Sequence, residues 1–148
     1  MSADNADMII ERRIYRDNLD YPESELTEML IGLAFQMYNR LGYGYQEKYY
    51  HRAYSELLNG AGLSYRREQM AIIQFGQKKI GRYFIDFLVK NSVVVEFKVA
   101  NDFYLQHAKQ VLGYLKAIGC KVGLLVLITK SGIKVKRIVN TKSAQSAK

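Results

Sequence analysis

The sequence is poor in the residues that build covalent or metal-bridged scaffolds. Its single cysteine, Cys120, excludes an intramolecular disulfide framework and a multi-cysteine zinc site, and indicates a reducing compartment. With 1 proline and 11 glycines, the chain does not fit a low-complexity linker. The longest purely apolar run, 124–128, is far too short to cross a bilayer, and the polar, acidic start does not resemble a secretion signal. We therefore expect a soluble, cytoplasmic protein without membrane contact.

The composition that remains is typical of one compact, basic domain. Of 148 residues, 49% are apolar, enough for a core that covers most of the surface of the unfolded chain. The 22 basic and 14 acidic residues leave a net charge of +8. Such a surplus attracts a polyanion such as nucleic acid but also serves solubility, so charge alone favours nucleic acid only weakly.

Three sections are predicted along the chain: a flexible lead-in over 1–21, a folded domain over 22–140 and a polar tail over 141–148. In the domain, apolar residues at steps of three and four predict helices, and runs rich in β-branched and aromatic residues predict strands. The predicted elements are a helix over 26–41 between the caps Ser24 and Gly42, a helix ended by Asn59-Gly60, strands over 64–74, 79–89 and 93–99, a helix from the cap Asp102 to Ile118, and strands over 122–128 and 133–139. This order, ααβββαββ, predicts an α/β fold with a mixed central sheet flanked by helices.

One predicted strand carries charges in an otherwise apolar run. Within 93–99, Glu96 and Lys98 share a face about 7 Å apart, because side chains alternate along a strand. A three-residue loop over 90–92 would place Asp86 opposite Glu96, with Cβ atoms about 5 Å apart. Two neighbouring carboxylates repel each other unless a proton or a cation lies between them. The expected cation is Mg²⁺ or Mn²⁺, since both prefer oxygen ligands.

Each of these features also has an ordinary explanation. A glutamate and a lysine two residues apart on a strand are more often an ion pair on a solvated face. Glu47, in the first turn of the second helix, suits the positive end of the helix dipole. One face of the third helix carries Phe103, His107, Gln110 and Tyr114, and this stripe favours core packing of the aromatic residues. A histidine and a glutamine in that stripe are less ordinary and could meet the acidic cluster.

Four motifs follow one another along the chain: Gly44-x-x-Glu47-x-x-Tyr50, Asp86, Glu96-x-Lys98 and Gln110-x-x-x-Tyr114. Taken together, they resemble a known family. They are similar to those of the GxxExxY protein family, a branch of the PD-(D/E)XK nuclease superfamily, and the resemblance covers about residues 26–140. It implies the αβββαβ restriction-endonuclease-like core, here with an extra N-terminal helix and an extra C-terminal strand. Ile85 and Tyr43 stand where many relatives have proline.

The resemblance implies a metal site and a reaction. Asp86 and Glu96 would be metal ligands, joined by the backbone carbonyl of Phe97 and by Glu47 as an auxiliary acid from its helix. The metal would be Mg²⁺ or Mn²⁺. The implied function is hydrolysis of phosphodiester bonds in nucleic acid.

Further roles follow from the same resemblance. Lys98 would be the catalytic lysine, and Gln110 and Tyr114 would orient active-site groups and substrate, as the matching motif does in RecB-type exonucleases. His107 could touch the phosphate backbone, although a lone histidine on a helix is more often structural.

Substrate binding would use the basic surplus, with DNA favoured over RNA. Two other readings stay open at this point: a catalytically silent nuclease-fold module that binds nucleic acid or a protein partner, and a small structural subunit acting as a homodimer. The basic residues expected to contact nucleic acid are Arg66, Arg67, Lys78, Lys79 and Arg82, which lie near the first hairpin.

Overall fold

The computed structural model describes residues 23–141. The predicted lead-in over 1–21, and all of the predicted tail except residue 141, lie outside them. The elements are α2 (Ser24–Leu41), α3 (Glu47–Gly60), β1 (Tyr65–Phe75), β2 (Lys78–Val89), β3 (Val93–Val99), α4 (Leu105–Ile118), β4 (Val122–Thr129) and β5 (Gly132–Val139). The predicted order of helices and strands is confirmed, and the strand ends differ from the prediction by one residue at most.

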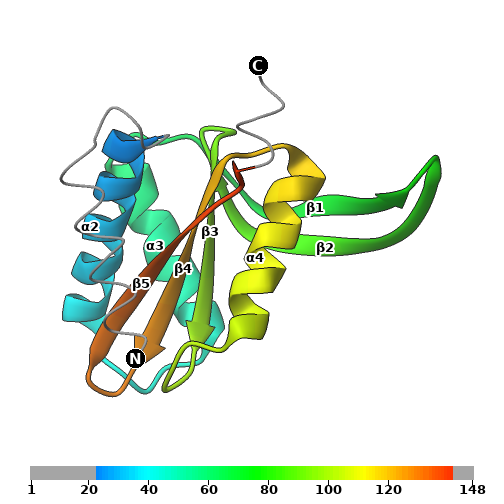
Figure 1. The fold of residues 1–148 in the computed structure, drawn as a ribbon. Helices are drawn as coiled ribbons and strands as arrows, with labels where there is room; N and C mark the ends of the chain where they lie inside the picture. Colours follow the sequence, from blue (N-terminus) through cyan, green and yellow to red (C-terminus); the bar gives the residue numbers. More distant parts are fainter. Residues whose placement is uncertain (1–22, 142–148) are drawn as a thin grey trace.

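The five strands form one mixed sheet in the order β1-β2-β3-β4-β5. Strands β3 and β4 run parallel and are joined by α4, and the other neighbours are antiparallel. Helices α2 and α3 cover one face of the sheet and α4 covers the other (Figure 1). Every residue of β4 is buried, as predicted for a strand covered on both faces. No helix within residues 23–141 has the length and apolarity needed to cross a membrane.

Two predicted helix caps are wrong. Ser24 is already the first residue of α2, and Glu23 takes the cap position with a φ of 59°. The α4 helix begins at Leu105 with Tyr104 as its cap, because the Asp102 carboxylate accepts the backbone N–H of the next residue instead (2.8 Å). The predicted C-terminal glycine Gly42 is confirmed, since its φ is 72° and its N–H donates to the carbonyl of Tyr38.

Close packing holds α4 against the sheet through a glycine of β4. A Cβ atom added to Gly123 would lie 2.9 Å from Cγ1 of Val111 and 3.3 Å from Cδ2 of Leu115. The absence of a side chain at this position therefore sets how closely α4 approaches β4. This approach sets how closely α4, which carries three of the predicted site residues, lies over the sheet.

The β1–β2 and β2–β3 hairpins differ in their turns. Val89 pairs with Val93, so the predicted loop over 90–92 is confirmed, with Lys90 and Asn91 both in the left-handed region. The β1–β2 turn is the two-residue Gly76-Gln77, shorter than predicted. The β1–β2 hairpin extends past α4 and curls away from the rest of the sheet (Figure 1).

Candidate active site

The site begins where the β2–β3 ladder stops. The last paired residues toward the open end are Phe87 and Val95, and Asp86 and Glu96 follow them. The backbone N–H of Asp86 donates to Oε1 of Glu96 (2.6 Å), and the backbone N–H of Phe97 donates to Oδ2 of Asp86 (2.9 Å). The two carboxylates thus take up backbone donors at the end of the ladder, and they lie side by side as the register predicts.

Of Asp86 and Glu96, Glu96 is the more deeply buried, with 2% of its surface exposed. Burial raises the pKa of Glu96 well above its usual range, and the neighbouring Asp86 carboxylate raises it further, while Lys98 opposes the shift. A second negative charge therefore costs free energy at this position unless a proton or a cation compensates it.

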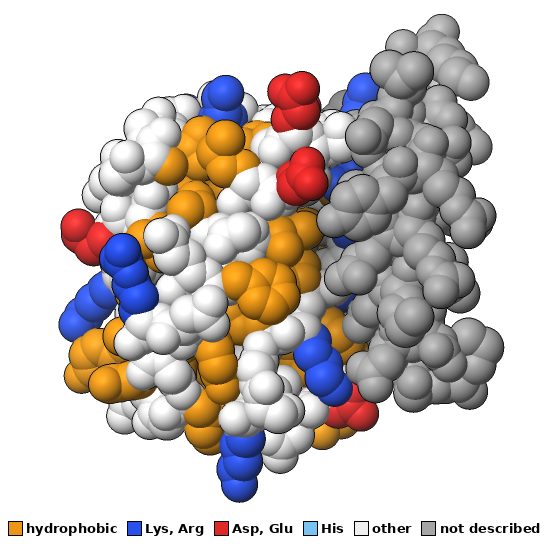
Figure 2. Space-filling view, turned by 90° about the vertical axis from the view of Figure 1, so that its left-hand side faces the viewer, with side chains coloured by type: hydrophobic (Ala, Val, Ile, Leu, Met, Phe, Trp, Pro, Cys, Tyr) orange, Lys and Arg blue, Asp and Glu red, His pale blue; other side chains and the backbone are white. Residues whose placement is uncertain are grey.

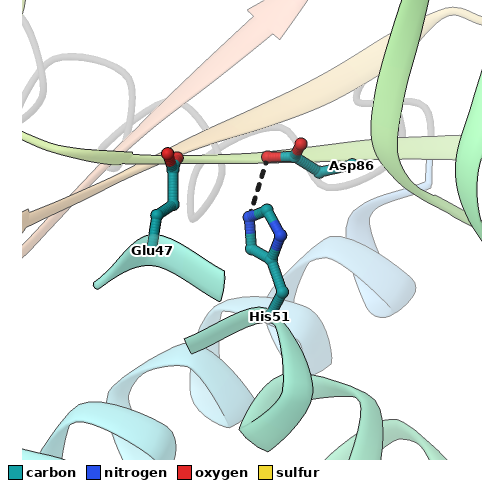
Figure 3. Close-up of side chains that lie close together, drawn as sticks. All are labelled: Glu47, His51 and Asp86. Carbon is teal, nitrogen blue, oxygen red and sulfur yellow. Dashed lines mark ion pairs between the residues drawn. The ribbon is translucent and has the colours of Figure 1, made fainter. Parts of the chain in front are cut away.

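Helix α3 brings two more potential metal ligands close to Asp86. Glu47 and His51 lie one helical turn apart, and both point at the Asp86 carboxylate from the α3 side (Figure 3). One potential ligand atom from each of the three residues lies within 4.8 Å of the other two. Burial, followed by the charge of Asp86, raises the pKa of Glu47. The prediction included Glu47 and Asp86 but missed His51, whose spacing of four from Glu47 was the available signal.

The imidazole of His51 tests whether a metal fits. Its Nε2 lies 3.2 Å from Oδ2 of Asp86, but the nitrogen is buried and has no aligned hydrogen-bond partner within residues 23–141. The ring is held between Phe87 and Phe97, with centroids 5.8 and 5.6 Å away. The two carboxylates suit Mg²⁺ or Mn²⁺, and a fixed imidazole nitrogen beside them favours Mn²⁺, because Mg²⁺ prefers oxygen ligands.

The Gly44-x-x-Glu47-x-x-Tyr50 motif explains why α3 starts where it does. Gly44 has a φ of 118°, a backbone conformation that favours glycine. Tyr50 is buried, and its hydroxyl donates to the carbonyl of Gly42 (2.6 Å), which ties the connection between α2 and α3 to the first turn of α3. Glu47 is the first residue of the helix. The glycine and the tyrosine thus aim the glutamate between them at the sheet.

The other predicted residues lie on the α4 side of β3. Lys98 lines a cavity of about 560 Å³. Tyr114 is buried beneath it against the ring of Tyr83, at a centroid distance of 4.7 Å. Burial first, and then the charges of Glu96 and Asp86, raise the pKa of Tyr114. The full lining of this α4 cavity is Tyr83, Lys98, Gln106, His107, Lys109 and Gln110.

Residues 24–138 match the family model of the PD-(D/E)XK nuclease superfamily. The chain belongs to this superfamily. Among solved structures it is similar to SSO0001, with a TM-score of 0.53 and 24% identity over 84% of this chain and 64% of that one. It is also similar to the alkaline exonuclease LHK-Exo from Laribacter hongkongensis, with a TM-score of 0.50 and 12% identity over 91% of this chain and 78% of that one. The chain thus spans less than two thirds of SSO0001, and no curated protein matches it.

These likenesses confirm the predicted restriction-endonuclease-like fold. On this PD-(D/E)XK domain the predicted residues fall into two groups, one on each side of Glu96. Glu47 and Asp86 meet on the α3 side, together with His51. Lys98, His107 and Gln110 meet around the α4 cavity. Phe97 is buried on the α3 side and donates its backbone N–H to Asp86, and a metal contact from its carbonyl oxygen stays a prediction.

The basic residues predicted to contact nucleic acid are spread along the β1–β2 hairpin of this domain. Arg66 and Arg67 lie on β1 near the base of the hairpin, and the Arg67 guanidinium lies 5.6 Å from the centre of the Phe87 ring. Lys78 and Lys79 lie at the tip, about the length of a strand away. Basic side chains are also scattered, not gathered, on the side of the molecule where α2 lies (Figure 2). The structure therefore gives the predicted basic residues no single patch.

Proposed function

We propose that this domain is a metal-dependent nuclease of the GxxExxY branch, which hydrolyses phosphodiester bonds in nucleic acid with Mg²⁺ or Mn²⁺. The observation that carries the proposal is the convergence of Glu47, His51 and Asp86, with an imidazole nitrogen that has no aligned partner, beside the Glu96 and Lys98 strand. Family membership supports the same reaction class.

In this proposal the chain holds the metal through side chains of both α3 and β2. Asp86, Glu47 and His51 are the proposed ligands, and Glu96 and the carbonyl of Phe97 complete the predicted set. A divalent ion there supplies Lewis-acid polarisation of the scissile phosphate and makes water more acidic. Because Glu96 is buried beside Asp86, its carboxyl favours the protonated form in the metal-free protein, and a bound cation would take the place of that proton.

Lys98 supplies positive charge from the opposite side of Glu96. It faces the α4 cavity, so its ammonium can contact a phosphate whose reacting bond lies above the carboxylates. Gln110 lines the same cavity and can hold Lys98 or a water by hydrogen bonding. Tyr114 is a positioning residue, because it packs under the cavity against Tyr83.

The experiment pairs cleavage with metal-induced stabilisation. Wild-type protein is assayed on single-stranded DNA, duplex DNA and RNA with Mg²⁺, Mn²⁺ or Ca²⁺, and its thermal unfolding is recorded with and without Mn²⁺. We expect cleavage with Mg²⁺ and Mn²⁺ but little with Ca²⁺, whose looser coordination positions water poorly. Manganese at about 100 times its dissociation constant should add about 2.7 kcal/mol to the free energy of unfolding.

Matched variants locate the activity. Asp86→Asn and Glu47→Gln should abolish cleavage and the stabilisation by Mn²⁺, whereas Lys98→Ala should abolish cleavage and keep the stabilisation. Glu56→Gln, an exposed position of the same helix, is the control and should behave as wild type. Wild-type protein that shows neither cleavage nor stabilisation would contradict the proposal and leave the non-catalytic binding module.

The finer points of the substrate are also proposed here. DNA is favoured over RNA, and charge reversal at Arg66 and Arg67 should flatten the dependence of binding on salt, because fewer counterions are released. Cytoplasmic location and a homodimer stay predictions.

A further inference from the structure

The α4 cavity is lined by hydrogen-bond donors, and no carboxylate is found among its lining residues in the described part of the chain. Lys98 and Lys109 bring two positive charges, and Gln106, Gln110 and the Tyr83 hydroxyl add neutral donors. Its volume of about 560 Å³ exceeds what a water or a metal ion needs. A cavity of this size with two ammonium groups and no acid is suited to an anion with several oxygens, which in a nuclease-family domain means a phosphate.

The cavity joins the proposed catalytic site through Lys98. Glu96 and Lys98 are two residues apart on β3, about 7 Å along the same face. Lys109 reaches the cavity from α4, on the side away from Glu47 and His51. A phosphate held between Lys98 and Lys109 would therefore lie next to the proposed scissile position, as a neighbouring phosphate of the same strand does.

The rim of the cavity offers an aromatic surface to a base. Tyr104 caps α4 and is 53% exposed, and Leu105 beside it is 70% exposed. The Tyr104 ring meets the imidazole of His107 edge to face, at a centroid distance of 5.5 Å. About half of Tyr104 is therefore accessible to a stacking base, beside His107, which lines the cationic cavity.

We propose that the α4 cavity binds a phosphate of an unpaired nucleotide whose base stacks on Tyr104, so that the domain selects single-stranded nucleic acid or an unpaired strand end. A base inside a duplex is covered by its neighbours on both faces, whereas an unpaired base can offer a face to an aromatic ring. The proposal rests on the proposed function, since it names the substrate class of that site.

Binding without turnover tests the cavity. In Ca²⁺, the affinity of a fluorescein-labelled oligothymidylate of about 12 nucleotides is compared with that of a duplex of equal length. We expect the single strand to bind more tightly. Lys109→Gln should weaken its binding about fivefold or more and lower the slope of log affinity against log salt by about 0.7. Lys116→Gln, the same charge change in the last turn of the same helix, should alter binding by less than about twofold.

A second pair of variants tests the stacking surface. Tyr104→Ala should weaken single-strand binding about fivefold or more, and Tyr104→Phe should retain wild-type binding, because it keeps the ring. The melting temperatures of all variants are recorded, and only those that match wild type are compared. Equal losses for Lys109→Gln and Lys116→Gln, or tighter binding of the duplex by wild type, would overturn the proposal.

The outcomes separate this proposal from the function on which it rests. If wild type cleaves with metal but the two lysine variants have equal effects, the nuclease proposal is supported and the phosphate-binding role of the α4 cavity is contradicted. If Lys109→Gln selectively loses single-strand binding but wild type shows no cleavage, the phosphate-binding role of the α4 cavity is supported and the nuclease proposal is contradicted.

Discussion

Replacing Glu96 by glutamine should change how the stability of the fold depends on pH. The side chain is buried, and its Oε1 accepts the backbone N–H of Asp86. A glutamine can keep that hydrogen bond through its own carbonyl oxygen while it removes the ionisable group. The variant therefore isolates the free-energy cost of a buried negative charge beside Asp86.

The sign and the size follow from the pKa. Burial and the Asp86 charge raise the pKa of Glu96 from 4.5 to about 9. A carboxyl with a raised pKa stabilises the fold fully below pH 4.5, and this contribution is lost as the pH rises toward about 9. Each pH unit between these two values lowers the free energy of unfolding by about 1.4 kcal/mol. By pH 7 the wild type should therefore have lost up to about 3 kcal/mol of stability relative to the glutamine variant.

Urea unfolding between pH 5 and pH 8, without divalent metal, measures this difference. The quantity of interest is the free energy of unfolding of Glu96→Gln minus that of wild type at each pH, because other titrating groups cancel in it. It should grow steadily with pH. Glu56→Gln, which replaces an exposed acid, should show no such growth. Saturating Mn²⁺ should reduce the difference, since a bound cation stabilises the ionised carboxylates of wild type.

Two results would refute this reasoning. A difference that stays constant from pH 5 to pH 8 would mean that Glu96 titrates in the folded protein much as it does in the unfolded chain. A difference that shrinks with rising pH would mean that the ionised form is the one stabilised, through Lys98 or the Asp86 N–H. Either result would remove the need for a proton or a cation between the two carboxylates.

Three further substitutions test the scaffold. Gly123→Ala should destabilise the fold by about 1–3 kcal/mol in urea unfolding, because the new methyl group would press on Val111. Tyr50→Phe removes the hydroxyl that donates to Gly42, so it should cost about 1 kcal/mol and weaken Mn²⁺ binding measured by calorimetry. Gly44→Ala should cost about 1 kcal/mol or more, since alanine disfavours a φ of 118°. Wild-type stability in any of the three would contradict the contact assigned to it.

Local patterns were enough to predict the order of the elements and the pairing of Asp86 with Glu96. A three-residue loop leaves only one register for the β2–β3 hairpin, and register decides which side chains are neighbours. Glu47 was found because it belongs to a motif at a helix start. Its partner His51 was missed, because a spacing of four in a helix is common and becomes informative only when α3 is packed over β2.

The lining of the α4 cavity was also only partly predictable from the sequence. Lys98, His107 and Gln110 were named from the strand and from one helical stripe, but Lys109 was not. Where α4 begins, and how closely it lies on β4, decide which helix residues reach the cavity. The predicted Asp102 cap was wrong because the Asp102 side chain bonds to the N–H of the adjacent residue instead of to a helix N–H. The sequence alone does not distinguish these two hydrogen bonds.

The crossed hydrogen bonds at the end of the β2–β3 ladder give the site a built-in reporter. The amide protons of Asp86 and Phe97 are held by carboxylate oxygens rather than by backbone carbonyls. Any ligand that draws on those oxygens changes the electron density at both amides and their rate of exchange with solvent. Two backbone resonances, one on β2 and one on β3, would therefore register occupancy of the site in solution, independently of whether a reaction follows.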